Sequence, residues 1–118
     1  MRSGNVVLEK SKAYAIRIVK LYRFLVNEKS EHVISKQILR SGTSIGANIT
    51  ESVYAQSRKD FGMKLSIAQK EAGETGYWLD LLFQTNLLNS PQYYSMKKDN
   101  DEILRLLQAI TKTLYNKN

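Results

Sequence analysis

The stretch Arg40-Ser-Gly-Thr-Ser-Ile-Gly-Ala-Asn-Ile-Thr-Glu51 decides how this chain folds. Its apolar residues recur with a helical period, yet its composition disfavours a helix. Gly42 and Gly46 each cost about 1 kcal/mol relative to alanine, and the neighbouring Thr43, Ser44 and Ile45 add a few tenths each. A helix here needs tertiary contacts that outweigh roughly 2–3 kcal/mol. We expect small side chains to let another helix approach closely, with a kink or break between the glycines as the alternative.

The residues on either side extend the pattern, with alternating spacings of four and three that are typical of helices packed in bundles. Four such seams follow one another along the chain. They consist of Ser11, Ala15, Ile18, Tyr22 and Leu25; Ile34, Ile38, Ser41, Ile45, Asn48, Ser52 and Ala55; Phe61, Leu65, Ala68, Ala72, Thr75, Leu79 and Leu82; and Met96, Asn100, Ile103, Leu107, Ile110 and Leu114. No segment alternates apolar and polar residues for long, so strands are not expected.

Polar connections between the seams set the expected helix boundaries. The predicted helices cover residues 8–28, 31–56, 58–88 and 91–115. Ser30 and Ser57 are expected to cap the second and third helices, and Ser90-Pro91 indicates an N-cap followed by proline at the first helical position. Because short connections make consecutive helices antiparallel, we expect an all-α protein, an up-down-up-down four-helix bundle with one domain over residues 1–118.

The composition excludes several classes of protein. The chain has no cysteine, which excludes disulfides and cysteine zinc sites and fits a reducing compartment. No apolar run approaches the ~20 residues of a membrane span, and the first residues do not form a signal peptide. We therefore expect a cytoplasmic protein with no membrane partner. The net charge of +7 favours a polyanionic partner, nucleic acid before an acidic protein, although a basic protein without such a partner is the alternative.

Basic residues gather on two predicted surfaces, on the first helix opposite its seam and near the turn between the second and third helices. Such side chains suit contacts to a phosphate backbone, which position a protein without reading sequence. The candidate nucleic-acid-binding residues are Lys10, Arg17, Lys20, Arg23, Arg58, Lys59 and Lys64. A solvated surface is the alternative for both groups. Tyr14, Tyr93 and Tyr94 are candidates for stacking bases, although tyrosines on helices are more often packing residues.

Several apolar residues lie outside the four seams. A helix with two apolar faces is usually buried on both, which in a small bundle indicates self-association. The candidate oligomer-interface residues are Ile16, Phe24, Met63, Ile67, Trp78 and Leu81. The alternative is that they are scattered exposed residues, which are normal on protein surfaces.

No pattern in the sequence indicates an enzyme, a cofactor or a metal site. His32 is the single histidine, so the Glu-x-x-His pairs of di-metal bundles are absent. Glu71 and Glu74 are expected to be carboxylates paired with Lys or Arg. The segment from Ser41 to Gly46 lacks the Gly-Lys-Ser/Thr ending of a phosphate-binding loop and follows no strand.

Three motifs carry a resemblance to a known family. Arg40, Ser41, Ser44, Ile45, Ala47, Asn48, Ile49 and Glu51 match Arg-Ser-x-x-Ser-Ile-x-Ala-Asn-Ile-x-Glu; Lys59, Phe61, Leu65, Ile67 and Ala68 form the second motif; and Glu74-Thr75-Gly76-Tyr77-Trp78-Leu79-Asp80-Leu81-Leu82 is the third. With these motifs, the chain resembles the 23S rRNA-intervening sequence proteins over nearly its whole length. It departs from them at Gly46, where many members have proline, and at Ser52, where many have glycine.

This resemblance implies a four-helix protomer that assembles into a ring-like homopentamer and carries no catalytic residues. It also implies a similarity to the accessory variability determinant protein of diversity-generating retroelements, a basic pentamer that binds nucleic acid and a reverse transcriptase. We therefore expect a non-enzymatic oligomeric bundle that binds RNA or DNA as an accessory or structural factor. The alternative is an adaptor that docks an acidic protein or a polymerase such as a reverse transcriptase.

Overall fold

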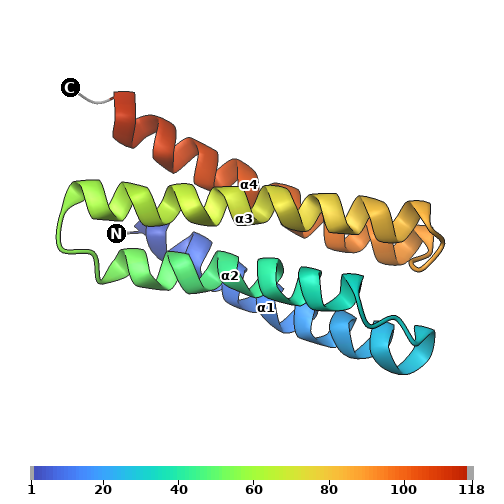
Figure 1. Ribbon diagram of the computed structural model, residues 1–118. Coiled ribbons are helices and arrows are strands. Elements are labelled where there is room, and N and C mark those ends of the chain that lie inside the picture. The colour runs from blue at the N-terminus through green and yellow to red at the C-terminus, as the bar shows by residue number, and fades with distance from the viewer. Residues whose placement is uncertain (1, 117–118) are drawn as a thin grey trace.

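The structure, a computed structural model, contains four long helices. In chain order they are α1 (Arg2–Lys29), α2 (Ile34–Val53), α3 (Arg58–Gln84) and α4 (Ser90–Asn116) (Figure 1). The backbone is described for residues 2–116 and the side chains for residues 6–116, and no strand occurs in that part of the chain. The prediction of an all-α four-helix fold is confirmed. The second helix is shorter at both ends than expected, and the third ends at Gln84 rather than near residue 88.

Each helix packs against two others. α2 lies between α1 and α3, while α4 contacts α3 and, less extensively, α1. Consecutive helices run antiparallel (Figure 1), and the bundle measures 49 × 21 × 20 Å along its principal axes. The helix ends therefore gather at the two ends of a long molecule.

A carboxylate, not a hydroxyl, caps α2. The side chain of Glu31 accepts hydrogen bonds from the backbone N–H groups of Val33, Ile34 and Ser35 at 3.1, 3.0 and 2.7 Å. Burial raises the pKa of this carboxyl, but the three donors outweigh burial and hold the pKa below its ordinary value. The expected cap at Ser30 is wrong, because Ser30 adopts a left-handed conformation with φ 51° outside the helix.

The other two caps follow ordinary N-terminal chemistry. The hydroxyl of Ser57 accepts from the N–H of Asp60 at 3.0 Å, which confirms the predicted cap of α3. At α4 the cap is Asn89, one residue before the expected Ser90. Asn89 Oδ1 accepts from the Gln92 N–H, and Gln92 Oε1 accepts from the Asn89 N–H, both at 2.9 Å. This reciprocal pair is a capping box, which satisfies two N–H groups at once.

The core follows the predicted seams of α3 and α4 closely. From Leu65 to Leu82, every predicted seam residue of α3 is buried, as are Met96, Asn100, Ile103 and Leu107 on α4. Two polar contacts cross this core. Thr75 Oγ1 donates to Ser41 Oγ at 2.9 Å, and Asn100 Nδ2 donates to the Ala72 carbonyl at 2.9 Å. The polar seam residues therefore join neighbouring helices.

Two seams are rotated relative to the prediction. On α1, Ser11, Ile18 and Leu25 are buried as predicted, but Tyr14 and Leu21 are buried in place of the predicted Ala15 and Tyr22, which are only half-buried. α1 contacts α4 as well as α2, so the direction of its buried side is set by two neighbouring helices and not by its own seam alone. On α2, Ile49 takes the core position expected for Asn48, whose side chain donates to the Ser44 carbonyl of its own helix at 2.9 Å.

The glycine-containing stretch is an unbroken part of α2, so the alternative of a helix break is wrong. A Cβ atom on Gly42 would lie 2.7 Å from Ile18 Cδ1 and Cγ1, far inside carbon–carbon contact distance. At Gly46 it would lie 3.3 Å from Ser11 Oγ and 3.4 Å from the Ser11 carbonyl oxygen. The missing side chains let α1 approach α2, which is the tertiary contact that the composition required.

Candidate nucleic-acid interface

The predicted basic residues of α1 divide into two kinds. Lys10 Nζ lies 3.1 Å from Glu102 Oε2, and Arg17 Nη1 lies 2.6 Å from Asp99 Oδ2. Arg17 also donates to the hydroxyl and the carbonyl of Ser95, at 2.8 and 3.3 Å. These two side chains therefore join α1 to α4.

Lys20 and Arg23 are exposed and take part in no ion pair of the described residues. They lie in the C-terminal half of α1, beyond Arg17, whose side chain contacts Ser95 and Asp99 in the first half of α4. Of the four basic residues predicted on α1, these two are the ones whose charges remain available to a phosphate backbone.

The second predicted basic group lies at the beginning of α3. Arg58 Nη2 donates to the Leu114 carbonyl at 2.8 Å and so holds the end of α4 against α3. Lys64 Nζ pairs with Glu51 Oε1 at 2.8 Å, which joins α3 to α2. Lys59 is exposed and has no ion-pair partner in the described part of the chain.

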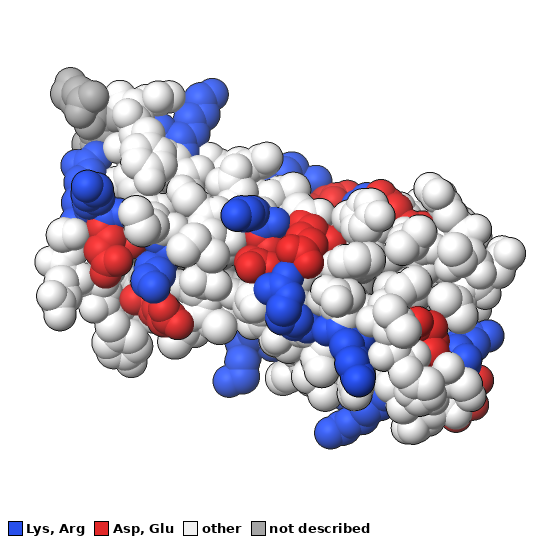
Figure 2. Space-filling view, in the orientation of Figure 1, with Lys and Arg blue, Asp and Glu red and all other residues white. Residues whose placement is uncertain are grey.

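The structure does not bring these two groups together in one patch. Lys20 and Arg23 lie toward the end of the bundle that contains the α3–α4 turn, whereas Arg58 and Lys59 lie at the opposite end (Figure 1). On the face seen in Figure 2, acidic side chains interrupt the basic ones. A nucleic acid that touched both groups would have to follow the long axis of the molecule.

The expected pairing of Glu71 and Glu74 with a basic residue is confirmed. Arg40 Nη2 lies 3.2 Å from Glu71 Oε1 and 2.6 Å from Glu74 Oε2. The indole N–H of Trp78 donates to the same carboxylate of Glu74 at 3.1 Å. The hydrogen bonds from Arg40 and then Trp78 lower the pKa of Glu74. This network fixes Trp78 beside the exposed ring of Tyr77, with the ring centroids 4.9 Å apart.

The candidate oligomer-interface residues occupy two separate surfaces. Met63, Ile67, Trp78 and Leu81 lie on α3 outside its core seam; Met63 is 52% exposed and the other three are half-buried. Ile16 on α1 is 49% exposed, while Phe24 packs against the core. Because α1 and α3 are not in contact, only the four α3 residues share one side of a single helix, and the charged residues between Lys70 and Glu74 divide them into two pairs.

A third basic surface, which was not among the predicted ones, lies on α4. Lys98, Arg105 and Lys112 are exposed and form no ion pair within residues 6–116. Their spacing of seven residues was the available signal, because residues seven apart lie on one side of a helix. Asp101, which is half-buried, is the acidic residue nearest this line.

An aromatic cluster stands at the beginning of this surface. The rings of Phe83 and Tyr93 are stacked, with centroids 4.3 Å apart and an interplanar angle of 8°. The Tyr93 hydroxyl donates to Asp80 Oδ1 at 2.5 Å, which raises the pKa of Tyr93. Tyr94 contacts both rings edge-on, at 4.9 Å from Tyr93 and 5.8 Å from Phe83, and is 62% exposed.

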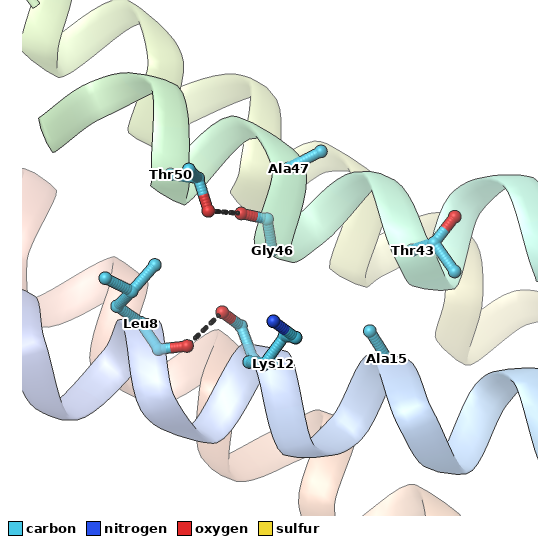
Figure 3. A pocket seen from close by; sticks show the side chains of 8 residues that line it. Leu8, Lys12, Ala15, Thr43, Gly46, Ala47 and Thr50 are labelled. Carbon is cyan, nitrogen blue, oxygen red and sulfur yellow. Dashed lines mark hydrogen bonds between the residues drawn. The ribbon is translucent and has the colours of Figure 1, made fainter. Parts of the chain in front are cut away.

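An open groove of about 220 Å³ runs between α1 and α2 (Figure 3). It exists because Gly46 of α2 and Ala15 of α1 leave little side chain between the two helices. The hydroxyls of Ser11 and Thr50 donate to the carbonyls of Leu8 and Gly46, each at 2.8 Å. Both hydroxyls donate to carbonyls of their own helices, and the groove follows from the close packing of α1 on α2.

Two further observations concern other classes of site. No group of three or more His, Asp or Glu side chains suited to hold a metal ion occurs among the described residues. None of the helices described is long and apolar enough to cross a membrane.

Comparison with known proteins identifies the family. Among solved structures, the chain is similar to a 1.70 Å crystal structure of a protein of unknown function from the S23 ribosomal protein family of Bacteroides thetaiotaomicron VPI-5482. The two share 59% sequence identity with a TM-score of 0.93, over 94% of this chain and 99% of the other. No match was found among curated proteins. The model of the 23S rRNA-intervening sequence protein family matches residues 4–109, and the chain therefore belongs to that family.

Proposed function

We propose that this protein is a non-enzymatic, oligomeric bundle that binds the phosphate backbone of RNA or DNA as an accessory or structural factor. One observation supports this most strongly. Between residues 6 and 116, ion pairs engage more than half of the acidic side chains but fewer than half of the basic ones. The excess of basic over acidic residues in this part of the chain is therefore carried by exposed, unpaired cations, which attract a polyanion.

Self-association would strengthen such binding. The apolar stripe on α3, which ends with half-exposed Met63, supports a homo-oligomer, and a pentamer is the expected form. Several copies on one nucleic acid act at a high effective concentration and raise avidity without a new contact. Light scattering of the purified protein measures the assembly directly, and a monomer at micromolar concentration contradicts this part of the proposal.

A salt titration tests the nucleic-acid proposal. Affinity for a DNA duplex, measured by fluorescence anisotropy, should fall with a log–log slope of about −0.9 for each phosphate contact. Replacing both Lys20 and Arg23 by Gln should make this slope shallower by about 2. The matched control replaces the exposed Lys36 and Lys70, which lie outside the predicted surfaces, by Gln. No binding at low salt, or a flat slope, contradicts the proposal.

The alternative is an adaptor that docks an acidic protein or a polymerase such as a reverse transcriptase. The network of Arg40, Glu74 and Trp78 favours it, because it holds an indole beside Tyr77, which is 58% exposed. Trp, Tyr and Arg are the residues most often responsible for binding energy at protein interfaces. Co-purification after nuclease treatment separates the two functions. A partner retained without nucleic acid, and lost on Tyr77→Ala, supports the adaptor.

A further inference from the structure

We propose that the outer side of α4 binds single-stranded nucleic acid, with Tyr94 as the platform on which a base stacks. This inference rests on the proposed function and names the form of nucleic acid that this surface selects. We call the surface the α4 outer stripe. It consists of Tyr94, Lys98, Arg105 and Lys112.

The geometry of the helix places these four side chains in one line. At 100° per residue, Tyr94, Lys98, Arg105 and Lys112 fall within an arc of about 40° on the side of α4 away from its core seam. The three cations follow one another at intervals of about 10 Å along the helix axis. All four side chains are exposed, and none of the three cations forms an ion pair in the described residues. The stripe therefore presents positive charge along most of the helix.

The position of Tyr94 at the start of the stripe distinguishes it from a merely solvated charged surface. Its ring is held against two other aromatic rings, and one of these, Tyr93, is fixed by its hydrogen bond to Asp80. Lys97 also contacts Asp80, at 3.2 Å, and lies 5.8 Å from the centre of the Tyr93 ring. An ordered, largely exposed aromatic ring followed by cations is the combination that binds single strands. Bases in a duplex are already stacked on each other and cannot use this ring.

Two neighbouring charged residues change the affinity of the α4 outer stripe for a phosphate backbone in opposite directions. Lys20 lies on α1, one helical turn beyond Arg17, which contacts Ser95 next to Tyr94. It therefore adds positive charge at the end of the bundle where the stripe begins. Asp101 lies between Lys98 and Arg105 in the sequence and carries the opposite charge. It is expected to weaken binding of a phosphate backbone along the stripe.

The test compares three fluorescent probes: oligouridine, oligothymidine and a DNA duplex of mixed sequence. Tyr94→Ala should weaken binding of the single strands by about 5- to 150-fold, the range for loss of one stacked base, and leave duplex binding unchanged. Tyr94→Phe should retain single-strand affinity, because the ring remains. Tyr77→Ala is the matched control, since Tyr77 is similarly exposed, at 58%, and also contacts a second aromatic ring.

The cations provide a second, independent readout. Lys98→Gln combined with Arg105→Gln should weaken single-strand binding and make its salt dependence shallower by about 1.4, while Asp101→Asn should strengthen binding. Equal losses for Tyr94→Ala and Tyr77→Ala, or equal losses on single strands and duplex, overturn the inference but leave the proposed function standing. A native protein that binds none of the three probes overturns both.

Discussion

Replacing Gly42 with alanine tests whether close packing of α1 on α2 is what keeps the glycine-containing stretch helical. The new Cβ would lie 2.7 Å from Cδ1 and Cγ1 of Ile18 and 2.9 Å from Cγ2. Favourable carbon contacts need about 3.5–4.0 Å, so Ile18 or the whole of α1 must move by roughly 1 Å. Ile18 has no exposed surface, which means that its side chain cannot move into solvent.

Two effects of opposite sign set the size of the change. Overpacking a filled core costs about 1–3 kcal/mol, whereas alanine in place of glycine within a helix contributes about 1 kcal/mol. We therefore expect Gly42→Ala to lower the free energy of unfolding by about 0–2 kcal/mol. The helix-propensity gain alone is measured by Gly73→Ala, because a Cβ at Gly73 meets nothing within 4 Å. Gly73→Ala should stabilise the protein by about 1 kcal/mol.

The difference between the two glycine variants isolates the packing effect, because both gain the same helix propensity. Urea unfolding followed by circular dichroism, at one fixed protein concentration, should place Gly42→Ala about 1–3 kcal/mol below Gly73→Ala with unchanged m-values. Adding Ile18→Val, which removes Cδ1, should cost less in the Gly42→Ala background than alone. If Gly42→Ala stabilises as much as Gly73→Ala, close packing is not the reason for the glycine.

Two further predictions concern the cap of α2 and the stripe on α3. Glu31→Ala should lower the free energy of unfolding by about 0.5–2 kcal/mol at neutral pH. Because the folded pKa of Glu31 is lowered, its contribution is complete above the unfolded pKa of about 4.3 and is lost as pH falls through the folded value. Unfolding curves of both proteins should converge in acid, and a gap that persists there refutes the carboxylate cap. Met63→Glu should dissociate the oligomer in light scattering while leaving the helix content unchanged. Ser66→Glu, an exposed control on the same helix, should not, and equal behaviour of the two variants excludes the α3 stripe as the interface.

The apolar periodicity of the sequence was sufficient to predict the fold. The positions where it predicted the wrong core residue have a common cause. On α3 the apolar residues outside the seam form a separate group, and the predicted seam from Leu65 to Leu82 is the side that is buried. On α1, Tyr14 adjoins Ala15 and Leu21 adjoins Tyr22, and either member of each pair continues the apolar pattern. The choice depends on where α4 lies, which a local pattern does not contain.

The charged residues were harder to assign for a related reason. In the sequence, nothing distinguishes Lys10, Arg17 and Lys64 from Lys20. In the structure, each of these three residues meets a carboxylate on another helix. Which cations remain unpaired is decided by the neighbours that the fold brings together. The spacing of Lys98, Arg105 and Lys112 was visible in the sequence, but their isolation from acidic partners depends on the positions of the neighbouring helices.

The difference between cations that bridge two helices and cations that remain unpaired determines how charge substitutions on α1 should be interpreted. Contact between α1 and α4 is the least extensive of the four helix pairs, and Lys10 and Arg17 bridge these two helices. Exposed ion pairs contribute about 0–1 kcal/mol each, so removing both weakens the packing of α4 on α1 by at most about 2 kcal/mol. The α4 outer stripe would move with it. A loss of nucleic-acid binding in an Arg17 variant therefore reports the position of α4 as much as a phosphate contact, whereas Lys98 and Arg105 report the contact alone.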